Sequence, residues 1–129
     1  VAFGNIVFTN NTFVNVLAAS NVWFNCGTIT KATVTGNLLY MAADKLMENN
    51  QSILNSANAV ITGGTIENNI FYTGQEKSYM AIYGGKDNWF EGVKEITKLT
   101  SDPFAGGTFD LSAGKFVPGS ESASYGAQR

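Results

Sequence analysis

Three short stretches of the chain repeat one order of apolar and polar residues. Residues 8–14, 34–40 and 66–72 each read apolar, polar, Asn or Gly, Asn, variable, large apolar, apolar. A degraded fourth copy occupies residues 86–90. Short β-rich pieces therefore alternate with Gly or Asn turns, which predicts short strands separated by sharp bends.

The second Asn position falls at Asn11, Asn37, Asn69 and Asn88, so the intervals are 26, 32 and 19 residues. Such uneven spacing argues against helical-hairpin repeats, whose period is nearly fixed. We expect an all-β, right-handed parallel β-helix of about four or five coils, in which loops account for the variation in coil length. An antiparallel sandwich with Asn-Gly hairpins is the alternative fold.

The repeated Asn has a physical explanation in such a fold. Asn tolerates the left-handed backbone of a sharp bend, and its side-chain amide both donates and accepts hydrogen bonds. Strands lie roughly 4.8 Å apart, so equivalent amides in successive coils can bond one another. We expect a ladder of Asn11, Asn37, Asn69 and Asn88, with Gly36 meeting the same backbone demand.

Two stretches interrupt the strand pattern. Residues 42–58 carry apolar residues at helical spacing and predict a short helical insertion at a coil corner, and residues 87–100 predict a second short helix. We expect one domain over residues 1–129, with coils in 1–100 and a C-terminal cap and tail in 101–129. The cap's Phe104, Phe109, Leu111 and Phe116 are expected to cover the edge of the last coil.

The chain starts directly in the first copy, without a comparable cap. We therefore expect it to be a C-terminal part of a longer solenoid, with upstream coils of the same protein as its neighbours.

The composition excludes several classes of function but identifies none. The net charge is −2, which disfavours nucleic-acid binding by a basic surface, and no apolar run approaches the length of a membrane span. The sequence has no histidine, which excludes Ser-His-Asp and Cys-His catalytic systems within this chain. The single cysteine, Cys26, is expected to be a buried thiol.

The Asn-rich coils, the Asp102-Pro103-Phe104 turn, the 107–111 stretch and the Gly- and Ser-containing end resemble the C-terminal part of pectate-lyase-like right-handed β-helix proteins. The end of the chain is also similar to domains of unknown function in secreted Bacteroidetes proteins. The resemblance implies a secreted or cell-surface protein associated with polysaccharide, which would include uronate-containing polysaccharide.

The catalytic residues of that superfamily have no counterpart in this sequence. Its lyases use an Arg or Lys base with calcium held by clustered Asp, whereas the only arginine is Arg129 and the aspartates are scattered. Hydrolases of the superfamily need a close carboxylate pair, and none is visible. We therefore assign no catalytic residue and no metal-ligand set, although Asp44 and Glu48 have the spacing either of a calcium site or, more simply, of a solvated helix face.

A cluster of aromatic and charged residues is the best candidate for glycan binding, because aromatic faces stack on sugars and Lys can meet a carboxylate. The alternative is that Tyr79, Ala81 and Tyr83 form one outward strand face, while Trp89 caps the core. Trp23 could likewise stack on sugar or pack under the insertion. The set comprises Lys77, Tyr79, Tyr83, Lys86, Asp87, Trp89 and Trp23.

Three functional hypotheses remain open at this level. The first is an extracellular scaffold or glycan-binding β-helix module. The second is part of a polysaccharide lyase whose active site lies largely in upstream coils. The third is a surface adhesion or structural module that binds protein partners.

Overall fold

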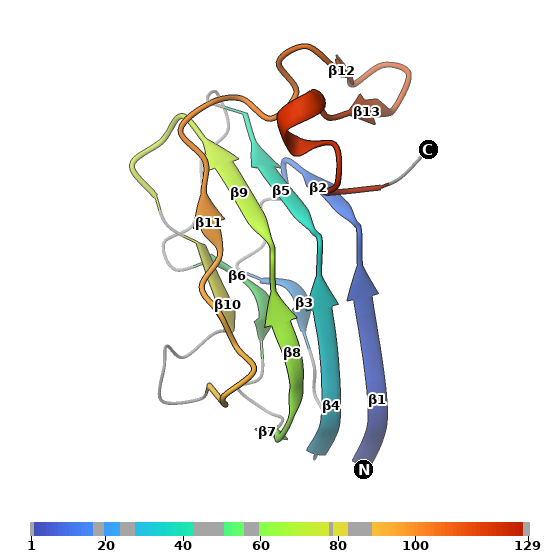
Figure 1. Ribbon diagram of the computed structural model, residues 1–129, viewed down its shortest axis with the longest axis vertical. Coiled ribbons are helices and arrows are strands. Elements are labelled where there is room, and N and C mark those ends of the chain that lie inside the picture. Colours follow the sequence, from blue (N-terminus) through green and yellow to red (C-terminus); the bar gives the residue numbers. More distant parts are fainter. Residues whose placement is uncertain are drawn as a thin grey trace.

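The computed structural model describes residues 2–16, 20–23, 28–42, 51–55, 60–77, 79–82 and 89–127. The structure is all-β, and the helical structure in these residues is a short 3₁₀ turn, η2 (Ser120–Ser122). The chain folds into three sheets of parallel strands and one small antiparallel hairpin (Figure 1).

Sheet one contains the longest strands. β1 (Ala2–Thr9) pairs with β4 (Thr28–Thr35), which pairs on its other side with β7 (Val60–Ile61) and β8 (Gly64–Glu67). The register places Phe8 beside Val34 and Val34 beside Ile66. Each step from one strand to the next is parallel, so a connecting chain must return between them.

Sheets two and three supply that return path. Sheet two has the order β11 (Thr97–Lys98), β9 (Ile70–Thr73), β5 (Leu38–Met41), β2 (Thr12–Val14). Sheet three has the order β10 (Tyr79–Ile82), β6 (Gln51–Asn55), β3 (Ser20–Trp23). All neighbouring strands in both sheets are parallel, so the antiparallel sandwich alternative is wrong.

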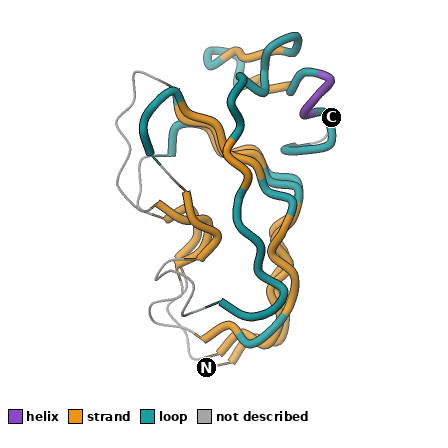
Figure 2. The backbone as a smooth tube through the Cα atoms, turned by 60° about the vertical axis from the view of Figure 1, so that its left-hand side comes forward, coloured by secondary structure: helices purple, strands orange, loops and turns teal. Residues whose placement is uncertain are grey.

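The chain visits the sheets in the same order each time. Pass one is β1, β2, β3; pass two is β4, β5, β6; and pass three is β7 and β8, then β9 and β10. A fourth pass begins where Val93 bridges Ile66 and continues into β11. Viewed along the stacking direction, the strands of successive passes lie over one another (Figure 2).

The main core lies between the three sheets. Alternation along β4 turns Ala32 and Val34 inward, where neither is exposed, and leaves Lys31 in solvent. Sheet two contributes Leu39 and Phe71, and sheet three contributes Ile53, all at most 2% exposed. One continuous apolar cluster therefore links the three sheets.

Both predicted helices are wrong where the structure describes them. Within 42–58, residues Gln51–Asn55 form strand β6 with Ser52 and Ile53 buried; most of the rest lies outside the described residues. Residues 89–100 contain a β-bridge and strand β11 and no helix. Val93 and Ile96 pack on the core as parts of the fourth pass, and this packing outweighs their helical spacing.

The C-terminal segment covers a different surface from the one predicted. Strands β12 (Thr108–Asp110) and β13 (Lys115–Val117) form the antiparallel hairpin. The ring of Tyr40 in β5 contacts the rings of Phe104 and Phe109, with centroids 5.1 and 4.9 Å apart. The aromatics thus cover the outer face of sheet two rather than the edge of the last pass.

The reason for this placement is that both faces of β5 are apolar. Leu39 belongs to the main core, and Leu38 belongs to a second cluster with Ile70 and Phe104. An apolar outer face needs a cover, and the C-terminal segment provides it. Leu111, predicted to share this role, is 60% exposed.

Candidate functional site

A column of three asparagine amides joins the passes at the bend between sheets one and two. The Oδ1 of Asn37 accepts hydrogen bonds from the N–H and the Nδ2 of Asn11, at 2.9 and 3.0 Å. The Oδ1 of Asn69 accepts the same pair from Asn37, at 3.0 and 2.8 Å. We call Asn11, Asn37 and Asn69 the Asn column, and each member a rung.

The rung amides also bond the main chain of the preceding pass. Nδ2 of Asn37 donates to Phe8 O at 3.1 Å, and Nδ2 of Asn69 donates to Val34 O at 3.0 Å. In each case the acceptor lies three residues before the preceding rung. Asn37 and Asn69 are 0% and 2% exposed, so these bonds satisfy polar groups that water cannot reach.

The two positions of the repeated Asn pair have separate tasks. The first position holds the left-handed bend, with φ of 55° at Asn10, 71° at Gly36 and 57° at Asn68. The second position holds the rung. This division explains why Gly replaces Asn only at the first position, where backbone conformation matters and a side-chain amide does not.

The predicted fourth rung, Asn88, lies outside the described residues. The register pairs Thr97 with Ile70, which sets Ile96 opposite Asn69. Thr97 N–H donates to Asn69 O, as Ile70 N–H donates to Asn37 O. The position after Asn69 therefore belongs to Ile96, which packs against the core and ends the column of amides.

The described members of the predicted glycan-binding set do not form an open aromatic surface. The Tyr79 ring lies against Phe71 in the core, with centroids 4.9 Å apart, and Trp89 is half-buried against the same cluster. The carbonyl of Lys77 accepts a hydrogen bond from Lys98 Nζ at 2.9 Å. Trp89 thus lies at the core, whereas Tyr79 faces the core rather than one outward strand face.

Four members of that set have no described side chain. Tyr83, Lys86 and Asp87 lie outside the described residues. Trp23 ends strand β3, and only its backbone is described. The placement of the set as one site therefore stays a prediction, and the structure describes only the side chains of Lys77, Tyr79 and Trp89.

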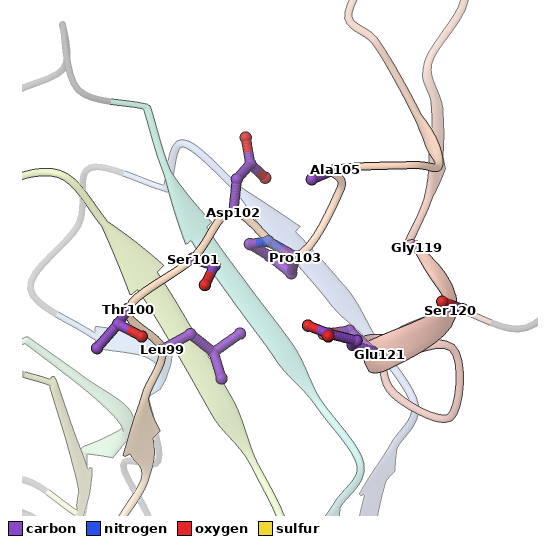
Figure 3. A pocket seen from close by; sticks show the side chains of 10 residues that line it. Leu99, Thr100, Ser101, Asp102, Pro103, Ala105, Gly119, Ser120 and Glu121 are labelled. Atoms are coloured by element: carbon purple, nitrogen blue, oxygen red, sulfur yellow. The ribbon is translucent and has the colours of Figure 1, made fainter.

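A hollow of about 560 Å³ lies between the exit from β11 and the turn η2, and no sequence motif predicted it. Glu121 projects from η2 into the space that separates this turn from the 99–103 segment (Figure 3). The lining comprises Leu99, Thr100, Ser101, Asp102, Pro103, Ala105, Gly119, Ser120, Glu121 and Ser122. We call this space the C-terminal hollow.

The C-terminal hollow is made mostly of hydroxyl groups, carboxylates and small apolar surfaces. Asp102 Oδ1 accepts the N–H of Phe104 at 2.8 Å, which fixes the Asp-Pro turn that forms one wall. Gly119 N–H donates to Pro103 O at 2.9 Å and ties the opposite wall to it. The described lining has two carboxylates and no Lys or Arg, so its chemistry favours ligands with hydroxyl groups over anions.

The described residues contain no group of three His, Cys, Asp or Glu side chains that could hold a metal ion. The spacing-based calcium candidates, Asp44 and Glu48, lie outside the described part of the chain. In the part that is described, no helix has the length and hydrophobicity needed to cross a membrane.

Comparison of the chain with protein-family models, with curated proteins and with solved structures gives no significant match.

Proposed function

We propose that the chain is a right-handed parallel β-helix module of a secreted or cell-surface protein, and that it serves as a glycan-binding scaffold rather than as an enzyme. The repeated order of the three parallel sheets supports the fold assignment, because each strand pairs with its equivalent one pass later. The polysaccharide connection rests on the resemblance to pectate-lyase-like proteins.

The observation that carries the binding proposal is the composition of the C-terminal hollow. Hydroxyls of Thr100, Ser101 and Ser120 and the carboxylate of Glu121 can donate to or accept from sugar hydroxyls, while Leu99 and Pro103 offer apolar surface to sugar C–H groups. Binding sites for small ligands combine a few polar groups with apolar walls in this way.

The charge of the hollow selects among glycans. Asp102 and Glu121 are both acidic and no basic side chain is among the described residues that line the space, so a uronate carboxylate would meet repulsion. We therefore propose a neutral oligosaccharide as the ligand in preference to the uronate-containing one suggested by the resemblance.

Titration followed by amide NMR shifts tests this proposal. A panel of neutral oligosaccharides should include a ligand that shifts the amides of residues 99–105 and 119–122, and oligogalacturonate should shift none of them. Glu121→Gln should weaken binding about tenfold, the scale of one lost hydrogen bond to a charged group. Glu67→Gln, in β8 on sheet one, is the matched control and should leave affinity unchanged.

Two outcomes would contradict the proposal. Absence of any saturable shift with the neutral panel would remove the glycan-binding role. Release of unsaturated uronates, followed by ultraviolet absorbance, would favour the polysaccharide lyase hypothesis instead.

A further inference from the structure

The three strands of pass one all lie at sheet edges. β1, β2 and β3 each end the order of their own sheet and pair on one side only. We call the unpaired sides of these strands the open edge (Figure 1). An open edge presents main-chain N–H and C=O groups that another strand can pair with.

This open edge lacks the devices that usually prevent strand addition. The sequences of β1, β2 and β3 are AFGNIVFT, TFV and SNVW, with no charged residue and no proline. The opposite edge of sheet two is β11, only two residues long, and its Lys98 donates through Nζ to the carbonyls of Gln75 and Lys77. In sheet two, the far edge is thus protected by a short, charged strand and the open edge is not.

The Asn column is incomplete at the open edge in a specific way. In each completed step, a rung's Oδ1 accepts the N–H and Nδ2 of the preceding rung, and its Nδ2 donates to a carbonyl of the preceding pass. Asn11 donates to Oδ1 of Asn37. Among the described residues, no donor is hydrogen-bonded to Oδ1 of Asn11 itself. Asn11 therefore offers the same acceptor that Asn37 and Asn69 use.

The core is also open at this end. Phe8 and Phe13 pack against the main cluster but are only half-buried. Their register partners one pass later, Val34 and Leu39, are 0% and 2% exposed. Burial of the pass-one side chains therefore needs apolar residues from a strand beyond β1 and β2.

We propose that the open edge binds a further coil of the same repeat type: an extended polypeptide that runs parallel to β1 and β2 and places an Asn beside Asn11. Its Asn donates to Asn11 Oδ1, and its carbonyl three residues earlier accepts from Asn11 Nδ2. Its apolar residues lie beside Ile6, Phe8 and Phe13. The recognised pattern is apolar-x-apolar-x-x-Asn-x-apolar, a spacing that the chain itself shows at Ala32, Val34, Asn37 and Leu39. This inference does not depend on glycan binding.

One position allows the open edge to be blocked without breaking β1 from β4. Ile66 donates to Gly92 O and accepts from Lys94 N–H, so both its main-chain groups face pass four. Alternate residues of a parallel strand bond alternate neighbours. Phe8 lies in the same register row as Ile66, so its main-chain groups also face the following pass. Val7 precedes Phe8 by one residue, so its N–H faces the open edge. Its side chain is 58% exposed, so Val7→Pro removes an open-edge donor and disturbs no core contact.

A synthetic peptide of residues 28–41, which carries the pattern, tests the inference against the whole chain by fluorescence anisotropy and hydrogen exchange. We expect saturable binding that protects amides in β1 and β2 and leaves β11 unchanged. A peptide with Asn37→Leu should bind about tenfold more weakly, because it loses the side-chain hydrogen bond to Asn11 Oδ1. The Val7→Pro protein should also bind about tenfold more weakly, and Val7→Ala should bind as the unmodified protein does.

Three results would overturn the inference. The peptide could fail to bind, it could bind both Val7 variants equally although circular dichroism shows both to be folded, or its protection could fall on β11. Sedimentation of the protein alone adds a further check: self-association abolished by Val7→Pro would assign the open edge to a second copy of the chain instead.

Discussion

Asn37 and Asn69, which are 32 residues apart in sequence, share two hydrogen bonds through one oxygen: Oδ1 of Asn69 accepts both the N–H and the Nδ2 of Asn37. Both side chains are buried. A buried amide is favourable only while its bonds are made, because each unsatisfied group retains its desolvation cost. The column should therefore control stability, and its interior rung should matter most.

Asn37→Leu should lower the free energy of unfolding by about 3 kcal/mol or more. It removes the oxygen that accepts the N–H and Nδ2 of Asn11, and the side-chain donor to Phe8 O and Asn69 Oδ1. Asn11→Leu, at the end of the column, removes one described side-chain bond and should cost about 1 kcal/mol. Urea unfolding of the two variants measures the difference. Equal losses would show that the column does not act as a connected unit.

Two glycines separate backbone strain from steric contact. Gly64 has φ of 118°, and a Cβ there would meet the main chain of Ala32 in β4; Gly106 has φ of 80° and nothing within 4 Å of a Cβ. Gly106→Ala should cost about 1 kcal/mol from strain alone. Gly64→Ala should cost about 3 kcal/mol or more, because strand β8 must also move away from β4. Thermal unfolding that ranks the two variants the other way would contradict this packing.

Phe104 tests the cover over sheet two. It is 5% exposed and contacts Tyr40 and Phe109, so Phe104→Ala should destabilise the protein by about 3–5 kcal/mol. Limited proteolysis should then cut first within residues 105–127. Leu111→Ala, in the exposed hairpin turn, should change stability by no more than about 0.5 kcal/mol. Cleavage elsewhere in the Phe104 variant would show that the segment does not depend on this ring.

Tyr79 distinguishes core packing from sugar binding. Because its ring lies against Phe71, Tyr79→Ala should lower the free energy of unfolding by about 2–3 kcal/mol. Below the unfolding transition, the same variant should keep the affinity of the unmodified chain for any oligosaccharide that binds. A loss of affinity without a loss of stability would return Tyr79 to the glycan-binding surface.

The sequence predicted the parallel strands well because the Asn spacing follows the register directly. The intervals of 26 and 32 residues between rungs are also the offsets between paired strands, as in Phe8 with Val34 and Val34 with Ile66. Both depend on the same bend, where a left-handed residue and a buried amide leave few alternatives to Gly and Asn.

The fourth pass was harder to predict from residue type. Ile96 takes the position after Asn69 without being an Asn, because the register there is set by main-chain bonds such as Thr97 N–H to Asn69 O. Val93 and Ile96 are three residues apart, which is typical of one face of a helix. An irregular extended segment can also turn two such residues toward the same core, as it does here. The spacing alone does not distinguish a helix from such a strand, because the distinction depends on pairing with the neighbouring pass.

The C-terminal hollow could not be predicted because its walls come from separate segments. The sequence marked Asp102-Pro103 as a turn but carried no sign that Gly119 would bond Pro103 and bring Glu121 across from Leu99. The placement follows from the apolar outer face of β5, which attracts the aromatic residues of the C-terminal segment.

Buried amides join successive parallel passes, and scalar couplings across hydrogen bonds measure this joining atom by atom. In labelled protein, we expect a coupling from the main-chain nitrogen of Asn37 to the side-chain carbonyl carbon of Asn69, and a matching one from Asn11 to Asn37. Absence of both couplings, together with cross-strand contacts of antiparallel type around these residues, would contradict the account.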